Sequence, residues 1–317
     1  MILVTGATGF VGRALCERLK GQGALRIAVR TPVAGRWAEQ LDVVQAALDP
    51  AQDWRPALEG VVTVVQCAAR VHVMNDDAAN PLREFRRINV DGTLRLATQA
   101  AEAGVGRFVF ISSIKVNGES TVLGRLFTAQ QAPAPIDPYG VSKWEAEQKL
   151  RTLSAETGME VVIIRPVLVY GPGVKANFLN MMKWLYKGVP LPLGAIHNKR
   201  GLVALDNLVD LIVTCIDHPR AANQAFMVSD GEDLSTTELL QRMSQALGKR
   251  PRLLPVPAWM LETAAKILRK HSIAQRLCGS LQVDISHTRE CLGWTPPVSV
   301  DAALRKTAQH FLEQQRQ

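Results

Sequence analysis

Short apolar runs alternate with amphipathic segments along the first half of this 317-residue chain. The apolar runs are MILVT, LRIAV, DVVQAAL, VVTVVQCA, RFVFIS and EVVIIRP, each of a length typical of a buried strand. Between them lie helical patterns, above all PLREFRRINVDGTLRLATQAAEAG and DPYGVSKWEAEQKLRTLSAETG. This alternation predicts a parallel sheet with helices on both of its faces.

The last of these helical patterns carries its own start and stop signals. Asp137 is a good N-cap, because its carboxylate can accept a hydrogen bond from a free amide of the first turn. Pro138 suits the first helical position, and Gly158 suits the residue at which a helix ends. We therefore expect a helix between Asp137 and Gly158.

Beyond Pro166 the pattern loosens. VLVYGPGVKANF is rich in turn residues and is followed by a helix through residues 177–186 and a loop rich in Gly and Pro. The strand AFMVSD (225–230) is expected to return to the sheet, and the helices TTELLQRMSQALG and PAWMLETAAKILRKH, with the tail, to form a smaller lobe. The expected fold is an α/β doubly wound parallel sheet with a smaller, mostly helical C-terminal lobe. The expected boundaries are residues 1–168 plus 201–230 for the sheet domain and 169–200 plus 231–317 for the lobe.

Composition narrows the class of protein. The net charge is +8, but we find neither a basic stripe nor a nucleic-acid-binding motif, so we expect no nucleic-acid partner. The five cysteines are scattered and never form a C-x-x-C pair, which predicts a reducing compartment without disulfides, zinc or another metal. The best candidate for a membrane span, LVALDNLVDLIVTCI, carries Asp206 and Asp210 and is excluded. Because the first residues already read as a strand, we expect no signal peptide and a cytoplasmic protein.

A glycine-rich turn follows the first strand directly. In TGATGFVG, Gly6, Gly9 and Gly12 have the spacing G-x-x-G-x-x-G. The first permits a tight turn, the second lets the backbone approach a pyrophosphate, and the third lets the helix pack close to the strand. A purely structural turn would show the same spacing. The strand before it and the helix after it, which begins with Phe10 and Val11, favour a dinucleotide site of the Rossmann type.

Two positions bear on the choice of dinucleotide. Arg30 stands at the end of the second strand, where an NAD enzyme usually has an acidic residue, and Arg36 is nearby. Because an arginine can pair with a 2′-phosphate, this predicts NADP(H), with an adenine-stacking arginine in an NAD(H) enzyme as the alternative. Asp49, after the third strand, is placed to meet the adenine amino group or to lie solvated in a turn.

Tyr139 and Lys143 form a Y-x-x-x-K pair on the expected helix, and Ser113 ends a strand upstream. A phenol with a pKa of about 10 is a poor base at neutral pH. The ammonium group at i+4 lies on the same helix face and, with the charge of an oxidised nicotinamide, is expected to lower the pKa of Tyr139. Ser113 can hold a substrate oxygen towards the phenol. The trio predicts proton transfer coupled to hydride transfer at a carbonyl or alcohol.

These motifs, with INVDGT, ISSIKVNG, PYGVSK, RPVLVYGPG and RGLVALDNLVD, resemble the extended short-chain dehydrogenase/reductase superfamily over nearly the whole chain. Within it, they resemble the nucleotide-sugar epimerases, dehydratases and reductases. The resemblance implies that Ser113, Tyr139 and Lys143 are catalytic and that Lys143 also holds the nicotinamide ribose. It further implies that Ala68 and Pro166 line the cofactor channel and that Asn89 is a structural hydrogen-bonding residue nearby.

The same resemblance implies a sugar-nucleotide site. Arg200 matches an arginine that grips the diphosphate, and Asn177 an asparagine that approaches the pyrophosphate or sugar. Where many 4-epimerases have S-x-x-V-Y-G, this chain has SIKVNG, so Lys115 and Asn117 are expected to alter the sugar pocket. The stretches SSIKVNG, VYGPGVKANF and GSLQVD are most similar to the bacterial O-antigen branch, including reductases that form UDP-N-acetylquinovosamine for lipopolysaccharide.

Two weaker signals remain open at this point. His72, in a loop after the fourth strand, borders the sugar in the resemblance but equally suits a surface loop. Residues 249–276 hold seven Lys or Arg against Glu262 alone, and WMLETAAKILRKH within them has apolar residues at helical spacing. Such a helix could lie on an anionic membrane. We expect instead that its apolar face packs into the lobe and its charges are solvated.

The expected function is oxidoreduction at C4 of a UDP-sugar. The main hypothesis is NADPH-dependent reduction of a UDP-4-keto-6-deoxy-N-acetylhexosamine. The alternative is 4-epimerisation of a UDP-hexose or UDP-N-acetylhexosamine with a retained NAD. A third, a non-catalytic dinucleotide sensor on the same fold, is disfavoured by the intact Ser113, Tyr139 and Lys143. The resemblance also implies a homodimer.

Overall fold

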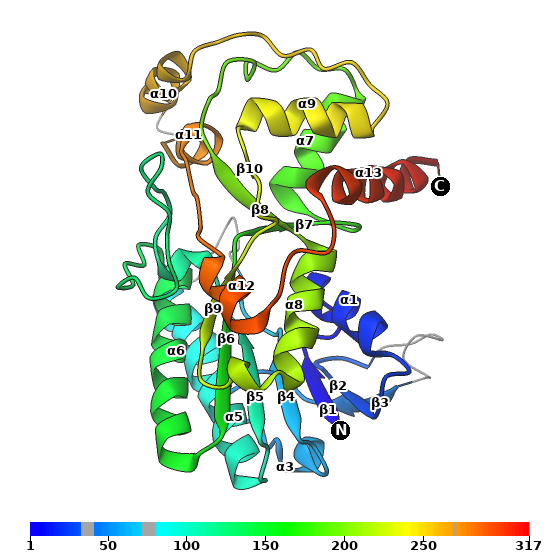
Figure 1. The fold of residues 1–317 in the computed structure, drawn as a ribbon, viewed down its shortest axis with the longest axis vertical. Coiled ribbons are helices and arrows are strands. Elements are labelled where there is room, and N and C mark those ends of the chain that lie inside the picture. The colour runs from blue at the N-terminus through cyan, green and yellow to red at the C-terminus, as the bar shows by residue number, and fades with distance from the viewer. Residues whose placement is uncertain (33–40, 72–79, 269–270, 317) are drawn as a thin grey trace.

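Seven parallel strands form the central sheet of the protein (Figure 1). The computed structural model describes residues 1–32, 41–71, 80–268 and 271–316. The spatial order of the strands is β3-β2-β1-β4-β5-β6-β9, and every neighbouring pair is parallel. The strands are β1 (Ile2–Thr5), β2 (Leu25–Val29), β3 (Asp42–Gln45), β4 (Thr63–Gln66), β5 (Arg107–Ile111), β6 (Glu160–Pro166) and β9 (Ala225–Val228). The doubly wound sheet expected from the alternating pattern is confirmed, including the return of the strand in AFMVSD.

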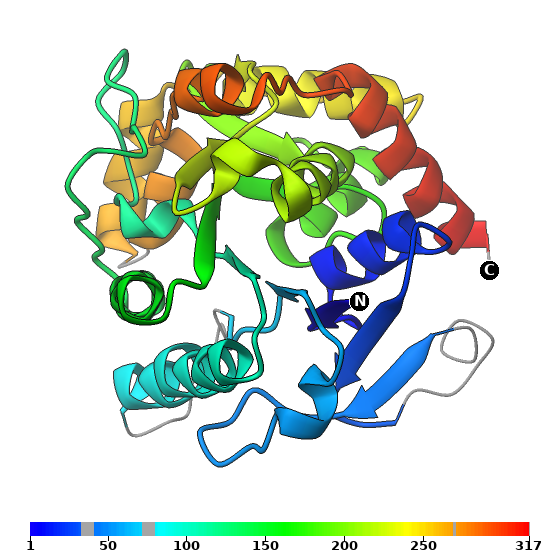
Figure 2. The same ribbon diagram turned by 60° about the horizontal axis from the view of Figure 1, so that its bottom comes forward.

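Helices cover both faces of this sheet, and Figure 2 shows the sheet between the two layers. One layer holds α1 (Phe10–Leu19) and α8 (Leu205–Asp217), whose apolar side chains join one core cluster. The other holds α3 (Arg55–Leu58), α4 (Pro81–Phe85), the π-helix η1 (Arg86–Gly92), α5 (Thr93–Glu102) and α6 (Pro138–Thr157). Because both faces are buried, β5 is apolar from Phe108 to Ile111.

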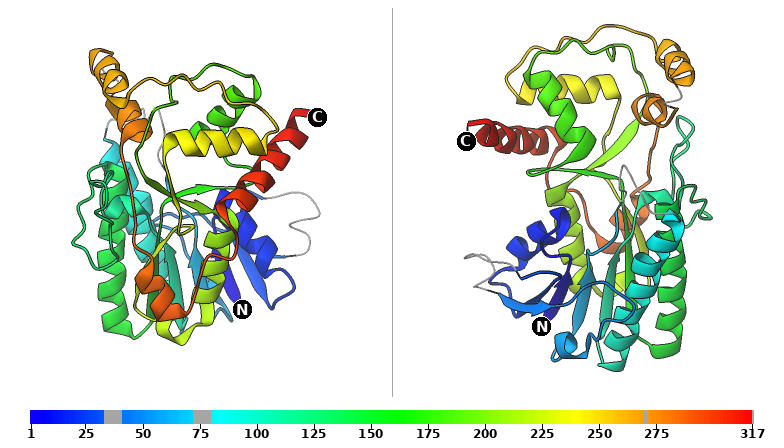
Figure 3. Two further views of the ribbon diagram at one scale, coloured as in Figure 1. Left: turned by 45° about the horizontal axis from the view of Figure 1, so that its top comes forward. Right: turned by 180° about the vertical axis from the view of Figure 1, so that it is seen from behind.

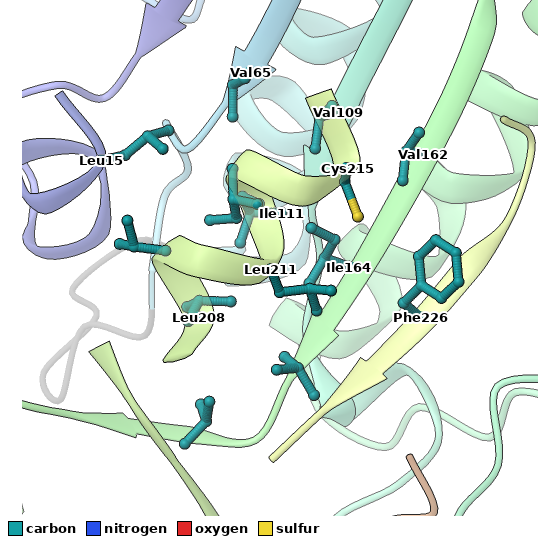
Figure 4. Close-up of a cluster of buried hydrophobic side chains, with 14 of the residues drawn as sticks. Leu15, Val65, Val109, Ile111, Val162, Ile164, Leu208, Leu211, Cys215 and Phe226 are labelled. Carbon is teal, nitrogen blue, oxygen red and sulfur yellow. The ribbon is translucent and has the colours of Figure 1, made fainter. Parts of the chain in front are cut away.

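Strand β5 shows how the two cores share one strand. Val109 and Ile111 point to the α1/α8 layer, whereas Phe108 and Phe110 point to the α5/α6 layer, as the two-residue repeat of a strand requires. Figure 4 shows the first of these cores, in which residues of α8 lie over strands β4, β5 and β6. The labelled side chains from α8 there are Leu208, Leu211 and Cys215.

The C-terminal lobe is built around a second, three-stranded sheet. Its order is β10 (Asp233–Leu234), β8 (Arg200–Ala204) and β7 (Leu168–Tyr170). The turn-rich segment VLVYGPGVKANF therefore contains a strand, which the sequence pattern did not predict. Its pairing is long-range, between β7 and β8, and is invisible to a local pattern. The helices of the lobe are α7 (Ala176–Tyr186), α9 (Thr236–Ala246), α10 (Ala258–Ile267), α11 (His271–Cys278) and α13 (Val300–Arg316).

The lobe and the sheet domain are interlocked along the chain. Residues Ile285, Leu292 and Trp294, at and around α12 (Ser286–Leu292), pack into the core cluster that contains α1 and α8. Trp294 also donates a hydrogen bond from Nε1 to Asp210 of α8, at 2.9 Å. The chain then returns to the lobe in α13, as both views in Figure 3 show. The domain boundaries expected from the sequence stay a prediction.

Candidate active site

The glycine turn lies between β1 and α1, at the point where the strand order reverses from β1-β2 to β1-β4. Gly6 has a φ of +69°, and a Cβ there would lie 2.6 Å from the backbone nitrogen of Ala68. A Cβ on Gly12 would lie 2.2 Å from the carbonyl oxygen of Gly6. Gly9 is the N-cap of α1 and offers no side chain to its first amides. This turn, which only glycine fits, leaves helix amides available for a phosphate, as a dinucleotide requires.

Arg30 and Asp49 lie beyond the ends of β2 and β3. Arg30 is exposed, and its carbonyl oxygen accepts a hydrogen bond from Gln45 at 3.4 Å. Asp49 accepts a hydrogen bond from the Ala51 amide at 3.0 Å and pairs with Arg87 of η1 at 2.5 Å. These partners lower the pKa of Asp49, the Ala51 amide most. Arg87, which the sequence did not indicate, thus lies beside Asp49, beyond the end of β3. Arg36 and His72 lie outside the described residues.

Helix α6 carries Tyr139 and Lys143 and begins and ends where the sequence predicts. Asp137 caps it by accepting a hydrogen bond from the Gly140 amide at 2.7 Å, and Gly158 ends it with a φ of 76°. The Lys143 side chain is 2% exposed, its ammonium lies over the Phe110 ring and it donates to the carbonyl oxygen of Ile111 at 2.8 Å. Lys143 is thereby held at the carboxyl end of β5.

The electrostatics of the pair differ from the sequence expectation. Burial lowers the pKa of Lys143 to about 7, against the opposing effects of Glu147 and Cys67. Burial, reinforced by Asp137, raises the pKa of Tyr139 above that of a free phenol, and a hydrogen bond with Ser113 opposes this only in part. In the protein alone the Tyr139 pKa is therefore raised rather than lowered, because burial and the Asp137 carboxylate both favour the neutral phenol.

Ser113, the third catalytic candidate, lies just beyond the carboxyl end of β5. It is the N-cap of the short 3-10 helix η2 (Ile114–Val116), and its Oγ accepts a hydrogen bond from the Lys115 amide at 3.2 Å. Ser113 also shares a hydrogen bond with Tyr139. Cys67, which interacts with Lys143, directly precedes Ala68, the residue that crowds Gly6. The trio thus lies at the carboxyl ends of the strands, on the same edge as the glycine turn.

Asn89 connects the site to its surroundings, as the resemblance implies. It is 1% exposed and lies in the π-helix η1, a helix type often found at functional sites. Its side chain bonds both the amide and the carbonyl of Arg70, at 2.8 and 3.0 Å. It also donates to Ser142 at 3.0 Å. Because Ser142 precedes Lys143, Asn89 fixes α6 against the loop after β4.

Two residues expected in the sugar pocket are instead bonded within the protein. The Lys115 ammonium pairs with Asp137 and, at 3.3 Å, with Glu119. Asn117 is 1% exposed, accepts a hydrogen bond from Arg165 and donates one to the carbonyl of Thr128, each at 3.0 Å. The side-chain amide of Asn117 therefore holds the loop after β5 to the core.

A model of the NAD dependent epimerase/dehydratase family matches residues 2–229 of the chain. The chain is also 50% identical, over 98% of its length and 95% of the relative's, to UDP-glucose 4-epimerase of Vibrio cholerae. The chain belongs to this family. Within it, the chain is 27% identical, over 98% of its length and 94% of the relative's, to N-acetyl-alpha-D-glucosaminyl-diphospho-ditrans,octacis-undecaprenol 4-epimerase of Escherichia coli O157:H7.

Solved structures of epimerases share the fold. UDP-glucose 4-epimerase of Thermotoga maritima, solved with UDP-glucose, superposes with a TM-score of 0.78 at 21% identity, with 99% of each chain covered. UDP-glucuronic acid 4-epimerase of Bacillus cereus, solved with NAD, gives a TM-score of 0.78 at 18% identity, with 98% of each chain covered. The protein is thus an enzyme of the extended short-chain dehydrogenase/reductase type, as the sequence motifs predicted.

On the lobe side of this epimerase/dehydratase fold, two arginines lie close together. Arg200 begins β8, is half-buried and donates to the carbonyl of Gly279 at 2.9 Å. Burial and then the like charge of Arg276 lower its pKa. Within the described residues, neither arginine has a carboxylate partner. A half-buried arginine next to an exposed second arginine, with no carboxylate on either in that part of the chain, is suited to a bound anion. Arg276 was not predicted individually, because its proximity to Arg200 depends on the fold.

A cavity of about 550 Å³ lies near Arg200, because Asn198, which lines the cavity, donates to the same Gly279 carbonyl as Arg200 does. It is lined by Ala195, Ile196, His197, Asn198, Pro257, Ala258, Trp259 and Cys278. Asn177, the remaining substrate candidate, is exposed near the start of α7.

No helix within residues 1–32, 41–71, 80–268 and 271–316 is both long and apolar enough to cross a membrane. In that same part of the chain, no group of three or more acidic, His or Cys side chains is arranged to hold a metal ion.

Proposed function

We propose that the protein is an NAD-dependent 4-epimerase of a UDP-hexose or UDP-N-acetylhexosamine. The observation that carries the proposal is the 50% identity to a UDP-glucose 4-epimerase across 98% of the chain. This is the alternative from the sequence rather than the main hypothesis of 4-keto reduction. That hypothesis depended partly on Lys115 and Asn117 in the sugar pocket, but both side chains are bonded within the protein. The geometry thus gives no reason to prefer reduction.

The residues divide into a cofactor set and a reacting set. The glycine turn and the first amides of α1 would hold the dinucleotide pyrophosphate, and Lys143 the nicotinamide ribose. When bound, NAD supplies the acceptor for a hydride from C4 and returns it. Tyr139 would take up and return the proton of the C4 hydroxyl, while Ser113 holds that oxygen. Because burial raises the pKa of Tyr139, its phenolate needs a nearby positive charge, which protonated Lys143 can supply.

The cofactor proposal also changes from NADP(H) to NAD(H). Arg30 alone favoured a 2′-phosphate, and it is exposed at the end of β2. The family description names NAD, and the solved Bacillus cereus epimerase holds NAD. An epimerase also has a chemical reason to retain its cofactor, because the same hydride must return to the sugar.

For the substrate, we propose that Arg200 and Arg276 bind the diphosphate and that the nearby cavity receives the nucleoside. The cavity volume of about 550 Å³ lies within the usual range for small-molecule sites. Asn177 would approach the sugar or pyrophosphate. The resemblance to the O-antigen branch supports a cytoplasmic homodimer that acts in the synthesis of surface polysaccharide.

An assay with two substrates tests the proposal. With NAD and no other redox partner, UDP-glucose or UDP-N-acetylglucosamine should equilibrate with its C4 epimer, without net change in reduced nicotinamide absorbance. In parallel, a UDP-4-keto-6-deoxy-N-acetylhexosamine is supplied with NADPH. Stoichiometric oxidation of NADPH there, with no epimerisation of either UDP-sugar, would show that the enzyme is a reductase.

A further inference from the structure

Helix α10 (Ala258–Ile267) exposes its apolar side chains instead of burying them. Within this helix no residue is buried. Trp259 is 66% exposed, Met260 46%, Ile267 77%, and the capping Leu268 66%. The expectation that this helix packs its apolar face into the lobe is therefore wrong. The reason is that only its opposite side contacts the protein.

The exposed side chains form one continuous stripe. Positions 259, 263 and 267 follow one another at i, i+4 and i+8, and positions 260, 264 and 268 form the adjacent row. The half-buried residues Ala258, Leu261 and Ala265 lie on the other side, where α10 contacts α11. Leu254, 51% exposed, precedes the helix and adds to the apolar surface. Contiguous exposed apolar surface of this kind marks an interaction site.

Basic side chains surround this stripe. Lys249, Arg250 and Arg252 precede α10, Lys266 lies on it, and Arg276 follows on α11; all five are exposed. Glu262 is the one acidic residue between positions 249 and 276. Within the described residues, none of the five has an ion-pair partner, although the Lys249 ammonium lies over the Tyr186 ring. An exposed apolar stripe flanked by uncompensated positive charge is complementary to a surface in which an anionic outer layer covers an apolar interior.

We propose that α10 docks the protein on an anionic phospholipid surface, with its apolar stripe in the interfacial region and Lys249, Arg250, Arg252 and Lys266 on the headgroups. Trp259 suits this role, because indole is amphipathic and favours the membrane interface. A second copy of the chain is a poorer occupant, since a symmetric contact would bring the same positive charges together. A protein attached in this way lies on the membrane surface and needs no membrane-spanning helix.

The position of α10 permits such contact. It lies at the outer end of the lobe in Figure 1, and it projects from the body in both views of Figure 3. It packs on α11, which carries Arg276 of the proposed diphosphate site. Docking would hold the lobe side of the substrate site close to the membrane surface.

Vesicle flotation tests the proposal with the full-length protein and needs no substrate, so the result is independent of the proposed function. The probes are phosphatidylcholine vesicles with and without about 30% phosphatidylglycerol. The protein should float with anionic vesicles, and binding should fall about tenfold or more on neutral vesicles or between about 50 mM and about 500 mM NaCl.

Matched variants locate the contact. Ile267→Asn should weaken vesicle binding about tenfold. Val62→Asn, which removes another exposed apolar side chain from the sheet domain, should not weaken it. Arg250→Glu with Lys266→Glu should abolish binding, whereas Arg18→Glu with Lys20→Glu on α1 makes the same change in net charge and should not. Circular dichroism verifies that each variant is folded.

Two outcomes would overturn the proposal. One is wild-type protein that fails to float with anionic vesicles at low salt. The other is binding that the α1 charge reversal lowers as much as the α10 reversal, which would show only a general attraction of a basic protein. Gel filtration in which wild type self-associates and Ile267→Asn does not, without vesicle binding, would assign the stripe to a second copy.

Discussion

Tyr139 and Lys143 lie one helical turn apart on α6, but burial moves their pKa values in opposite directions. The phenol is kept protonated by desolvation, and its pKa is raised. The pKa of Lys143 is lowered to about 7, so its ammonium is only partly populated near neutral pH. At the scale of single residues, each group thus favours its neutral form in the protein alone. A bound cofactor and substrate would change both environments.

Tyr139→Phe is expected to lower turnover by about 10²–10⁴-fold, because it removes the hydroxyl that would exchange the proton and keeps the ring. The edge contact of that ring with Phe85, at 6.0 Å between centroids, should persist. Steady-state rates with the UDP-sugar substrate, and calorimetric titration with NAD, measure the two effects. NAD affinity should stay unchanged. Near wild-type turnover would assign the proton to another residue.

Lys143 should make the stability of the protein depend on pH. Between its folded pKa of about 7 and its ordinary value of 10.5, the unfolded chain binds more protons than the folded chain, so stability rises with pH. Relative to Lys143→Met, the wild-type free energy of unfolding should therefore rise by about 2 kcal/mol between about pH 7 and about pH 9. Urea unfolding at both pH values measures this. Lys149→Met, at an exposed lysine of the same helix, is the control.

At the scale of elements, a buried ion pair joins α6 to β6. Glu147, 0% exposed, lies one turn after Lys143 and pairs with Arg165 of β6 at 2.5 Å. Glu147 also accepts a hydrogen bond from Ser112 at 2.5 Å, and Arg165 donates to Asn117. The network therefore fixes the helix that carries the catalytic candidates against two loops and a strand.

Glu147→Gln should destabilise the fold by about 3–5 kcal/mol, because it leaves the buried Arg165 without a counter-ion. Chemical unfolding measures the loss. Glu145→Gln is the matched control on the same helix, since it breaks the exposed pair with Arg86 and should cost less than about 1 kcal/mol. Equal losses in the two variants would show that burial of the pair is not what matters.

The turn between β1 and α1 is the second element on which the site depends. Gly12→Ala places a methyl group about 2.2 Å from the carbonyl oxygen of Gly6, so the helix must shift away from the turn. We expect dinucleotide affinity to fall at least tenfold and stability by about 1–3 kcal/mol. Gly106→Ala, whose Cβ would meet its nearest atom at 3.7 Å, should leave dinucleotide affinity unchanged in the same titration.

At the scale of the whole molecule, the sheet domain supplies the proposed cofactor site and the lobe supplies the two arginines of the proposed substrate site. Asp230, directly beyond β9, ties the two together. Its carboxylate accepts hydrogen bonds from Tyr170 of β7 at 2.8 Å and from Asn207 of α8 at 2.7 Å. Asn207 in turn bonds Val298, just before α13. The lobe is thus anchored to the sheet domain through one buried polar junction.

Arg200→Ala should weaken UDP and UDP-sugar binding about tenfold to a hundredfold, because the proposed charge-assisted hydrogen bond from Arg200 to a substrate phosphate is lost. Dinucleotide binding, on the other side of the site, should be unchanged. Calorimetric titration with UDP and with NAD separates the two. Lys199→Ala removes the neighbouring cation, which pairs with Glu238 at 3.3 Å, and serves as the control. Unchanged UDP affinity in Arg200→Ala would remove Arg200 from the site.

The sequence by itself determined the parts of the protein that depend on local pattern. Apolar runs and helical periodicity predicted the seven strands of the main sheet, because most of these strands are buried on both faces, the edge strand β3 being the exception. The glycine spacing predicted the turn before α1, since only glycine fits where Gly6 meets Ala68. The capping residues Asp137 and Gly158 predicted the ends of α6, and the i+4 spacing placed Tyr139 and Lys143 on one face.

Only the tertiary structure decided features that depend on residues far apart in the chain. The pairing of β7 with β8 turned a turn-rich segment into a strand. The fold brought Arg276 to Arg200 and placed Asn117 in a hydrogen bond with Arg165. Burial set the pKa values of Tyr139 and Lys143, because desolvation depends on every element packed around a group. The same long-range packing left the apolar stripe of α10 exposed, although its sequence has the periodicity of a buried helix.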